Sequence, residues 1–235
     1  MLKLDNINAG YGYLQVLWDV SFEVEKGKIV AILGLNGAGK TTTLKTISGV
    51  IRPTSGSISF DGGDITGSKP HELVKKGLVF IPEERNLFSG MSVYENLVMG
   101  AYIVRDRADV KRTLQYVYSL FPRLEERRKQ LVGTMSGGER QMVAVARGLM
   151  SSPKLVMLDE PSMGLSPQNV VIVFESIMKL RDEGVTVIIV EQNVNTTLKI
   201  ADYAYIMDHG SIVLSGTGEE LASDDNVQKM YLGLN

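Results

Sequence analysis

The sequence has no cysteine among its 235 residues. This absence excludes disulfide bonds, thiolate metal sites and cysteine nucleophiles, although it says little about the compartment. The sequence also lacks an apolar run of the roughly 18 residues that a membrane-spanning helix needs. Its first residues, MLKLDNINAGYG, have no signal-peptide core. We therefore expect a soluble cytosolic chain that associates with a membrane only through a partner.

The sequence also lacks an excess of either positive or negative charge. The formal net charge is −2, with acidic and basic residues interspersed, so the total suggests neither nucleic-acid binding nor an acidic tail. Apolar residues make up 44% of the chain, which is enough for a substantial core. Because no internal repeat, low-complexity tract or linker divides the sequence, we expect one domain over residues 1–235.

The order of the expected elements is typical of an α/β fold. The first segment alternates and places Val20, Phe22 and Val24 on one face. The runs IVAILG, GLVFIP, KLVMLDE and VTVIIVEQ predict buried strands, separated by helical patterns. This alternation predicts a mainly parallel sheet that is covered on both faces. Residues about 91–150 have helical spacing and predict a helical insertion, and YAYIMDHGSIVLSG predicts a hairpin that turns at His209-Gly210.

A glycine-rich segment, ILGLNGAGKTT, lies between a predicted strand and a predicted helix. Its spacing is that of a P-loop, in which backbone N–H groups and a helix N-terminus surround phosphate oxygens. Lys40 is predicted to bridge the β- and γ-phosphates of ATP, and the Thr41 hydroxyl to ligate Mg²⁺. The residues expected to hold the nucleotide here are Gly34, Asn36, Gly37, Ala38, Gly39, Lys40, Thr41 and Thr42. A turn without a ligand is the alternative.

Two adjacent acids, Asp159 and Glu160, end the run LVMLDE. Buried paired carboxylates are costly unless a cation, a proton or a donor compensates them. We expect Asp159 to hold Mg²⁺ through water, and Glu160 to position or deprotonate the water that attacks the γ-phosphate. A strand lying beside the P-loop strand would bring the two motifs together, because ligands gather at the carboxyl ends of sheet strands. The alternative is a capping pair in water.

The segment TMSGGERQMVAVARGLM predicts an amphipathic helix that begins with small residues. Its apolar stripe, expected in the core, consists of Met142, Val145, Ala146 and Leu149. The start of the helix, Ser136 to Gly138, is either an ordinary N-cap or a second anion-binding helix end. Since the P-loop already holds one nucleotide, a second phosphate-binding end suggests a γ-phosphate clamped between two chains.

The motifs GLNGAGKT, MSGGER and LVMLDE, in this order, resemble those of the nucleotide-binding subunits of ABC transporters over essentially the whole chain. The resemblance implies a P-loop NTPase core with a mainly parallel sheet, an N-terminal antiparallel β subdomain and a helical insertion. It implies head-to-tail dimers around two ATP molecules, in which Ser136, Gly138 and Glu139 act across the interface and closure on ATP is the power stroke. Tyr11 matches the family's adenine-stacking aromatic, with an ordinary surface tyrosine as the alternative.

Three positions depart from the common pattern of that family. Glu83 stands where most members have a glutamine that ligates Mg²⁺ and senses the membrane partner; a carboxylate can ligate metal but cannot donate as an amide does. Gln192 replaces a histidine that contacts the γ-phosphate, and it can donate a hydrogen bond without acting as an acid or base. Glu160 therefore remains the candidate base. Ser166 replaces an aspartate of the dimer interface and makes weaker contacts.

The same departures occur in one branch of the family. FIPEERNLFSGMSVYENLVMGAY, EPSMGLSP, IIVEQN and the terminal MYLGLN together resemble ATP-binding subunits of high-affinity branched-chain amino acid importers. Importers of urea or short amides share much of this pattern and remain an alternative. Lipopolysaccharide-export ATPases are also similar, but they carry a histidine at the position of Gln192.

The resemblance implies that the chain lies at the cytoplasmic face of the cell (inner) membrane, held there by permease subunits, and that it has several partners. They are integral-membrane permease subunits, a second ATPase chain that is either identical or a paralogue, and a solute-binding protein that acts indirectly. A groove beside Glu83 is expected to receive a permease helix, lined by Phe88, Met91, Tyr94, Leu97 and Tyr102, about half of them buried.

Two other function classes remain. Soluble ABC-type ATPases that act on DNA, chromosomes or ribosomes usually have coiled coils, tandem ATPase domains or a basic surface, which this sequence lacks. A nucleotide-binding regulator without turnover is disfavoured by the intact Lys40, Asp159 and Glu160.

Overall fold

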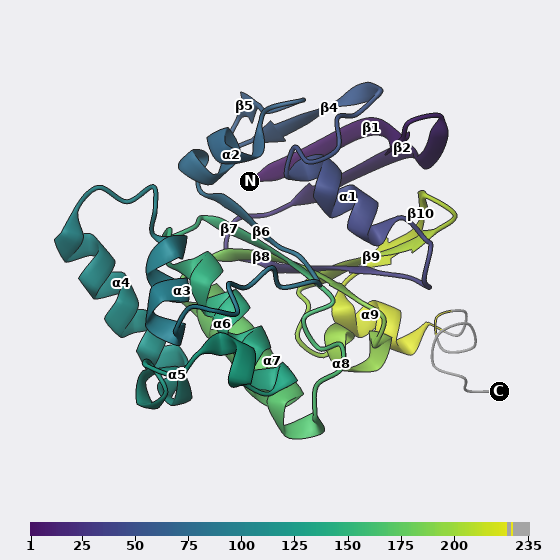
Figure 1. Cartoon of the computed structure of the whole chain (residues 1–235). Helices are drawn as coiled ribbons and strands as arrows, with labels where there is room; N and C mark the ends of the chain where they lie inside the picture. Colours follow the sequence, from purple (N-terminus) through teal and green to yellow (C-terminus); the bar gives the residue numbers. More distant parts are fainter. Residues whose placement is uncertain (225–226, 228–235) are drawn as a thin grey trace.

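Two β-sheets lie one above the other in the computed structural model, which describes residues 1–224 and 227 (Figure 1). The upper sheet is antiparallel and has the strand order β2-β1-β4-β5. Its strands are β1 (Leu2–Tyr11), β2 (Leu14–Val24), β4 (Ser55–Phe60) and β5 (Gly63–Asp64). The predicted apolar face of β2 is buried, from Val20 through Phe22 to Val24. The expected N-terminal antiparallel sheet is therefore confirmed.

The lower sheet has the order β10-β9-β3-β8-β7-β6 and is parallel from β9 to β6. Its strands are β3 (Ile29–Leu33), β6 (Leu78–Ile81), β7 (Leu155–Asp159), β8 (Thr186–Glu191), β9 (Tyr203–Asp208) and β10 (Ser211–Gly216). β10 pairs antiparallel with β9 through the predicted turn, where His209 and Gly210 both have positive φ. The mainly parallel sheet of an α/β fold is confirmed.

One expectation about this sheet is wrong. The strand that ends at Asp159, β7, does not lie beside the P-loop strand β3, because β8 lies between them and pairs with both. The order of parallel strands depends on where each crossover carries the chain, and local sequence patterns do not encode that path. The carboxyl ends of β3 and β7 are therefore separated by one strand.

Each face of the lower sheet contributes to its own hydrophobic core. Val30 and Ile32 of β3 belong to the core that also contains residues of the upper sheet and of α1 (Lys40–Ile47). α1 lies between the two sheets (Figure 1), and α2 (Pro70–Lys76) joins the same core through Leu73. Ala31 and Leu33 of β3 belong to the second core, with the helices on the opposite face. Because both faces are covered, the strand is apolar throughout.

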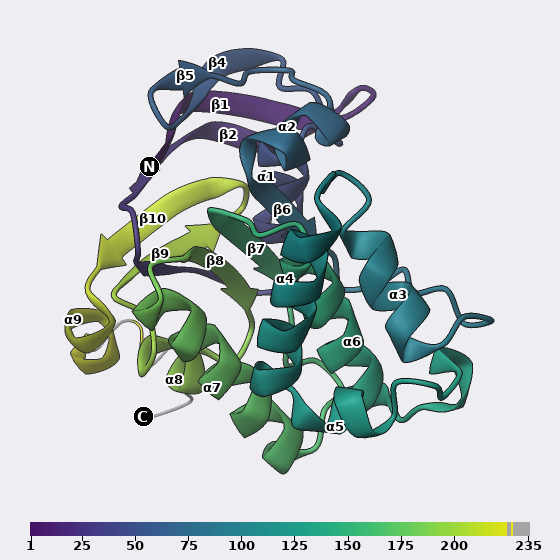
Figure 2. The ribbon, with the colours of Figure 1, turned by 90° about the vertical axis from the view of Figure 1, so that its left-hand side faces the viewer.

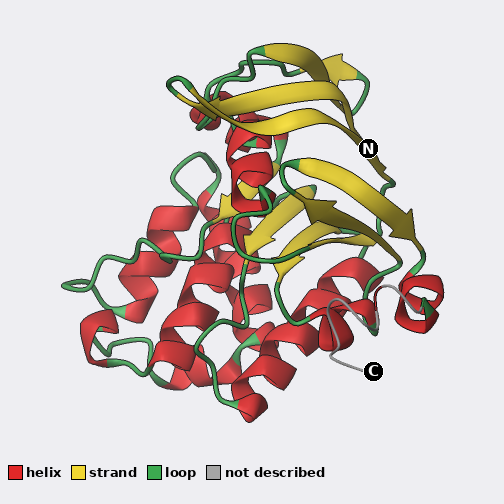
Figure 3. Ribbon diagram, turned by 90° about the vertical axis from the view of Figure 1, so that its right-hand side faces the viewer, coloured by secondary structure: helices red, strands yellow, loops and turns green. Residues whose placement is uncertain are grey.

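Helices lie on that side of the lower sheet, some against its strands and others packed on α6 (Figures 2 and 3). They are α3 (Val93–Gly100), α4 (Arg107–Leu120), α5 (Pro122–Glu126), the 3₁₀ turn η1 (Val132–Thr134), α6 (Gly137–Leu149), α7 (Pro167–Asp182), α8 (Val194–Leu198) and α9 (Gly218–Ser223). The predicted stripe of α6, from Met142 to Leu149, is buried. In the part of the chain described here, no helix is both long and apolar enough to cross a membrane. A separate helical subdomain over about 91–150 stays a prediction, and the terminal MYLGLN lies outside the described residues.

Candidate nucleotide site

The P-loop connects β3 to α1 and depends on its glycines. A Cβ at Gly34 would lie 2.3 Å from the carbonyl oxygen of Met207, and Gly39 has a φ of 104°. Glycine meets both requirements without strain. Lys40 begins α1, and its Nζ donates hydrogen bonds to the carbonyl oxygens of Gly34 (2.9 Å) and Leu35 (3.1 Å). The Lys40 ammonium group therefore lies against the loop that is predicted to hold the phosphates.

Thr41 and Asp159 meet beside the end of β7. Thr41 Oγ1 donates a hydrogen bond of 3.0 Å to Asp159 Oδ1, and Asp159 is 2% exposed. Burial raises the pKa of Asp159 to about 6; the Thr41 bond opposes this rise, and the nearby Glu160 and Glu83 carboxylates add to it. Hydroxyl and carboxylate oxygens suit Mg²⁺, and a cation would compensate the buried charge. Thr41 and Asp159 therefore fit a magnesium ion, which they would hold beside the phosphate-binding loop.

Gln192, which follows β8, contacts the candidate base. Its Nε2 lies 2.9 and 2.8 Å from the two carboxylate oxygens of Glu160 and 2.7 Å from Asn36 Oδ1. Lys40 Nζ lies 3.7 Å from Glu160 Oε1. Hydrogen bonds to an ionised group are short and directional. Because β8 lies between β3 and β7, Gln192 stands between the P-loop and Glu160 and restrains both.

A cavity of about 560 Å³ opens over these groups. The predicted residues that line it are Tyr11, Asn36, Gly37, Ala38, Gly39, Lys40, Thr41, Thr42, Glu83, Glu160 and Gln192. Gly34 and Asp159 do not line the cavity but hold Lys40 and Thr41, which do. Tyr11 ends β1 and is 48% exposed, so its ring is accessible to a stacked base. The structure thus brings these predicted residues together from β1, the P-loop and the loops after β6, β7 and β8.

Ser136, Gly138 and Glu139 lie apart from this cavity, at the start of α6. Ser136 Oγ accepts from the backbone N–H of Glu139, and Glu139 Oε2 accepts from the backbone N–H and the hydroxyl of Ser136. Arg127 Nε lies 3.2 Å from Glu139 Oε1. A Cβ at Gly138 would lie 2.1 Å from the Asn169 side chain, so glycine allows α7 to approach. Within one chain this segment is a capping box, and its action across a dimer interface stays a prediction.

Sequence reasoning missed some residues of the site. Leu14, Val16 and Met163 also line the cavity. Glu191, at the end of β8, is 2% exposed, and its Oε1 accepts a hydrogen bond of 2.8 Å from the backbone N–H of Ser162. Burial raises the pKa of Glu191. An apolar run that ends in an acid was the signal that identified Asp159, and the run VTVIIVE carries the same signal for Glu191.

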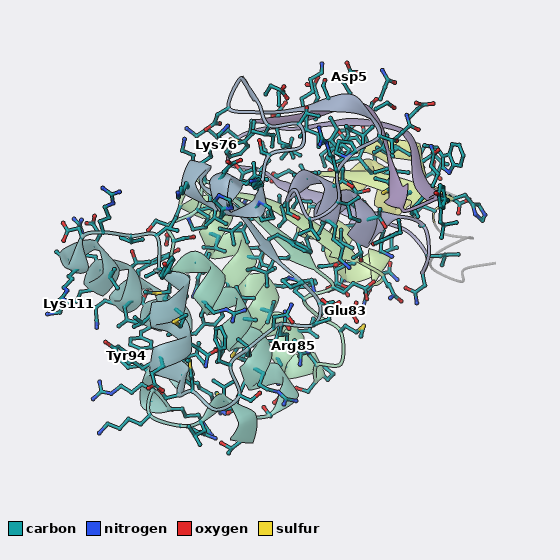
Figure 4. The ribbon with its side chains drawn as sticks, turned by 45° about the horizontal axis from the view of Figure 1, so that its top comes forward. Asp5, Lys76, Glu83, Arg85, Tyr94 and Lys111 are labelled. Atoms are coloured by element: carbon teal, nitrogen blue, oxygen red, sulfur yellow. The ribbon has the colours of Figure 1, made fainter. Side chains whose placement is uncertain are left out.

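The predicted lining of the docking groove is only partly correct, and docking there stays a prediction. Of the five predicted residues, Phe88 and Tyr102 line one cavity, and only Leu97 is buried rather than about half of them. A cavity of about 390 Å³ is lined by Phe80, Phe88, Met99, Tyr102, Arg147 and neighbouring residues. Leu97 is fully buried, and Tyr94 lines a different cavity with Tyr118 and Arg128. Figure 4 shows Tyr94 well apart from Glu83. Tyr94 and Met99 lie on different faces of α3, since five residues of an α-helix do not complete whole turns.

Comparisons with known proteins place these observations in a family. The family described as ABC transporter matches residues 17–163. The high-affinity branched-chain amino acid transport ATP-binding protein BraG of Pseudomonas aeruginosa is 48% identical, covering 99% of this chain and 100% of that protein. The probable branched-chain amino acid transport ATP-binding protein LivF of Archaeoglobus fulgidus is 40% identical, covering 100% and 99%. The lipopolysaccharide export system ATP-binding protein LptB of Escherichia coli K12 is 36% identical, covering 99% and 97%.

Solved structures give the same result. A nucleotide-free ATP-binding cassette from an ABC transporter superposes with a TM-score of 0.86 at 28% identity, covering 100% of this chain and 99% of that one. The ADP conformation of an ATP-binding cassette superposes with a TM-score of 0.87, also at 28% identity and with the same coverage. Both likenesses extend over the two sheets and the helices described above.

Proposed function

Because this chain belongs to the ABC transporter family, we propose that it is the ATP-hydrolysing motor subunit of an importer for branched-chain amino acids. ATP binding and hydrolysis follow from the family. The observation that carries the proposed residue roles is the meeting of the P-loop with two carboxylates, through the Thr41–Asp159 and Gln192–Glu160 hydrogen bonds. The transported class is supported by the full-length likeness to BraG and LivF.

ATP binds with its phosphates against the N–H groups of the P-loop and its base against Tyr11. Lys40 exchanges its two carbonyl acceptors for oxygens of the β- and γ-phosphates, which are stronger acceptors for an ammonium group. Thr41 and Asp159, with Glu83 as a further candidate, would hold Mg²⁺. When bound, this ion supplies positive charge that neutralises the phosphate oxygens.

Glu160 accepts the proton of the water that attacks the γ-phosphate. Gln192 keeps the Glu160 carboxylate aligned, because an amide donates to it at both oxygens and does not itself titrate over the physiological range. The role of Gln192 is therefore to orient the base and, once ATP is bound, to donate to the γ-phosphate.

The partners follow the same reasoning. A second ATPase chain, identical or paralogous, contributes Ser136, Gly138 and Glu139 across the interface. Permease subunits bind the groove that contains Phe88 and Tyr102, and they hold the chain at the cytoplasmic face of the membrane. A solute-binding protein acts through the permeases. The interspersed charges and the net charge of −2 give no support for a nucleic-acid partner.

The test is to measure ATP hydrolysis and ATP-dependent dimerisation of the wild-type chain and its Glu160→Gln variant, alone and with the permeases. We expect the variant to lose roughly 10²- to 10⁴-fold in turnover, as removal of a general base does, while still dimerising on ATP. Glu175→Gln, at an exposed position of α7, is the control.

Retained turnover in Glu160→Gln would exclude Glu160 as the base. A wild-type chain that neither hydrolyses ATP nor dimerises, even with permeases, would contradict the motor function. For the solute, leucine and the solute-binding protein should stimulate hydrolysis by the reconstituted assembly, and stimulation by urea or a short amide instead would overturn the branched-chain assignment.

A further inference from the structure

Arginine side chains connect the loop after β6 to two segments that are far from it in the sequence, α6 and the loop after β7. Arg85, in this loop, has a φ of 62°, a conformation that few residues other than glycine adopt. Its Nε donates a hydrogen bond of 2.5 Å to Oε1 of Gln141, which lies on α6 and is 2% exposed. Its Nη2 donates a hydrogen bond of 3.3 Å to the carbonyl oxygen of Met163. One guanidinium therefore joins α6 to the loop after β7.

Met163 lies within one turn of the candidate base. The backbone N–H of Met163 donates a hydrogen bond of 3.1 Å to the carbonyl oxygen of Glu160, which closes this turn. The neighbouring Ser162 N–H is bound by the buried Glu191. The carbonyl that Arg85 contacts therefore belongs to the short, tightly held segment that begins with Glu160.

The backbone of the same loop is also held by Arg147 of α6. Its Nη1 donates to the carbonyl oxygen of Asn86 (2.7 Å), and its Nη2 donates to that of Arg85 (2.8 Å). The Arg147 guanidinium also lies over the Phe88 ring, 5.8 Å from its centroid. Phe88 and Arg147 both line the groove of about 390 Å³. A ligand that moves either side chain in the groove therefore acts on the backbone that carries Arg85.

We propose that Arg85 is a positioning residue that fixes the position of the segment Glu160–Met163. This position depends on whether the Phe88–Arg147 groove is occupied. The inference rests on the proposed function for the identity of the groove's occupant. A planar guanidinium suits this role, because its fixed fork contacts two acceptors at once and couples their positions. Glu83 and Arg85 belong to the same loop and lie close together (Figure 4), so a shift of this loop also moves Glu83 at the nucleotide cavity.

The experiment compares Arg85→Met, Arg85→Lys and the control Arg112→Met, which changes an exposed arginine of α4. Two readouts are used: steady-state ATP hydrolysis, and backbone hydrogen exchange of the peptide that covers residues 160–166. For Arg85→Met we expect kcat to fall about tenfold with KM for ATP within about threefold, since Arg85 does not line the nucleotide cavity. Exchange at 160–166 should become faster, while exchange at β3 stays unchanged. Arg85→Lys keeps the charge without the fork and should recover part of each effect.

The link to the groove is tested on the assembly with permeases. Permease binding should alter exchange at residues 160–166 in the wild type, and this response should be lost in Arg85→Met although the permeases still bind.

Wild-type kcat and wild-type exchange at 160–166 in Arg85→Met would overturn the inference, as would faster exchange throughout the chain, which would indicate a general structural role. If the wild-type assembly does not hydrolyse ATP, the proposed function fails. The exchange measurements on the nucleotide-free chain then still decide whether Arg85 positions this segment.

Discussion

Replacing Asp159 with asparagine should stabilise the nucleotide-free chain while weakening its response to Mg²⁺ and ATP. Asp159 is 2% exposed, and burial raises the pKa of its carboxyl to about 6 from an ordinary value of 3.8. Between these values the folded state binds more protons than the unfolded state, so stability falls as the pH rises through this window. Above pH 6 the folded chain carries the full penalty, and the gap between the two values corresponds to roughly 3 kcal/mol. Asparagine removes the charge and keeps an oxygen for the Thr41 hydroxyl.

Urea unfolding at pH 5 and pH 7.5, followed by circular dichroism without nucleotide, measures this effect. At pH 7.5 we expect Asp159→Asn to raise the free energy of unfolding by about 2 to 3 kcal/mol, and at pH 5 by about half as much. Asp182→Asn, whose side chain is 64% exposed, is the control and should stay within about 0.5 kcal/mol of wild type. Saturating Mg²⁺ and ATP should stabilise the wild type more than Asp159→Asn, which keeps the P-loop but lacks the carboxylate for Mg²⁺. A variant less stable than wild type at pH 7.5, or a difference independent of pH, would refute the reasoning.

Two further predictions concern Gln192 and the groove. Gln192→Leu removes the donor that contacts Glu160. Because a hydrogen bond to a charged group is worth about 1.5 to 3 kcal/mol, kcat should fall roughly 10- to 100-fold in steady-state assays. Unchanged kcat would exclude a role of Gln192 in orienting Glu160. Tyr102→Ala should weaken co-purification with the permeases, because Tyr102 is 87% exposed and lines the groove. Tyr94→Ala should leave co-purification unchanged, because Tyr94 lines a different cavity. The reverse result would place the docking surface on the other face of α3.

The sequence predicts the elements of the fold better than their arrangement. β3, β7 and β8 could be located because each contains a continuous apolar run, which is the pattern of strands buried on both faces. The insertion of β8 between β3 and β7 could not be predicted, since strand order depends on long-range crossovers.

In the site as well, the sequence predicts local features better than contacts between distant segments. The P-loop residues are neighbours in the sequence, and their spacing alone indicates phosphate binding. The contact between Glu160 and Gln192 exists because β7 and β8 pair, and nothing local to either residue indicates it. Tyr94 shows how a local signal can mislead. Its aromatic side chain suggested a docking residue, but its position on the face of α3 places it at another cavity. Arg85 resembles an ordinary surface charge in the sequence, and its contacts with Gln141 and Met163 depend on three segments meeting.

The position of β8 has a consequence for the width of the site. Neighbouring strands of a sheet lie roughly 4.8 Å apart, so with one strand in between, the ends of β3 and β7 are spaced by about 10 Å. β8 thus acts as a spacer, and the side chain that follows it, Gln192, lies between the P-loop residue Asn36 and Glu160 and contacts both. Had β7 paired directly with β3, the space between their ends would be about half as wide. The strand order therefore sets how much room a phosphate, its counter-ion and a water molecule have to lie side by side.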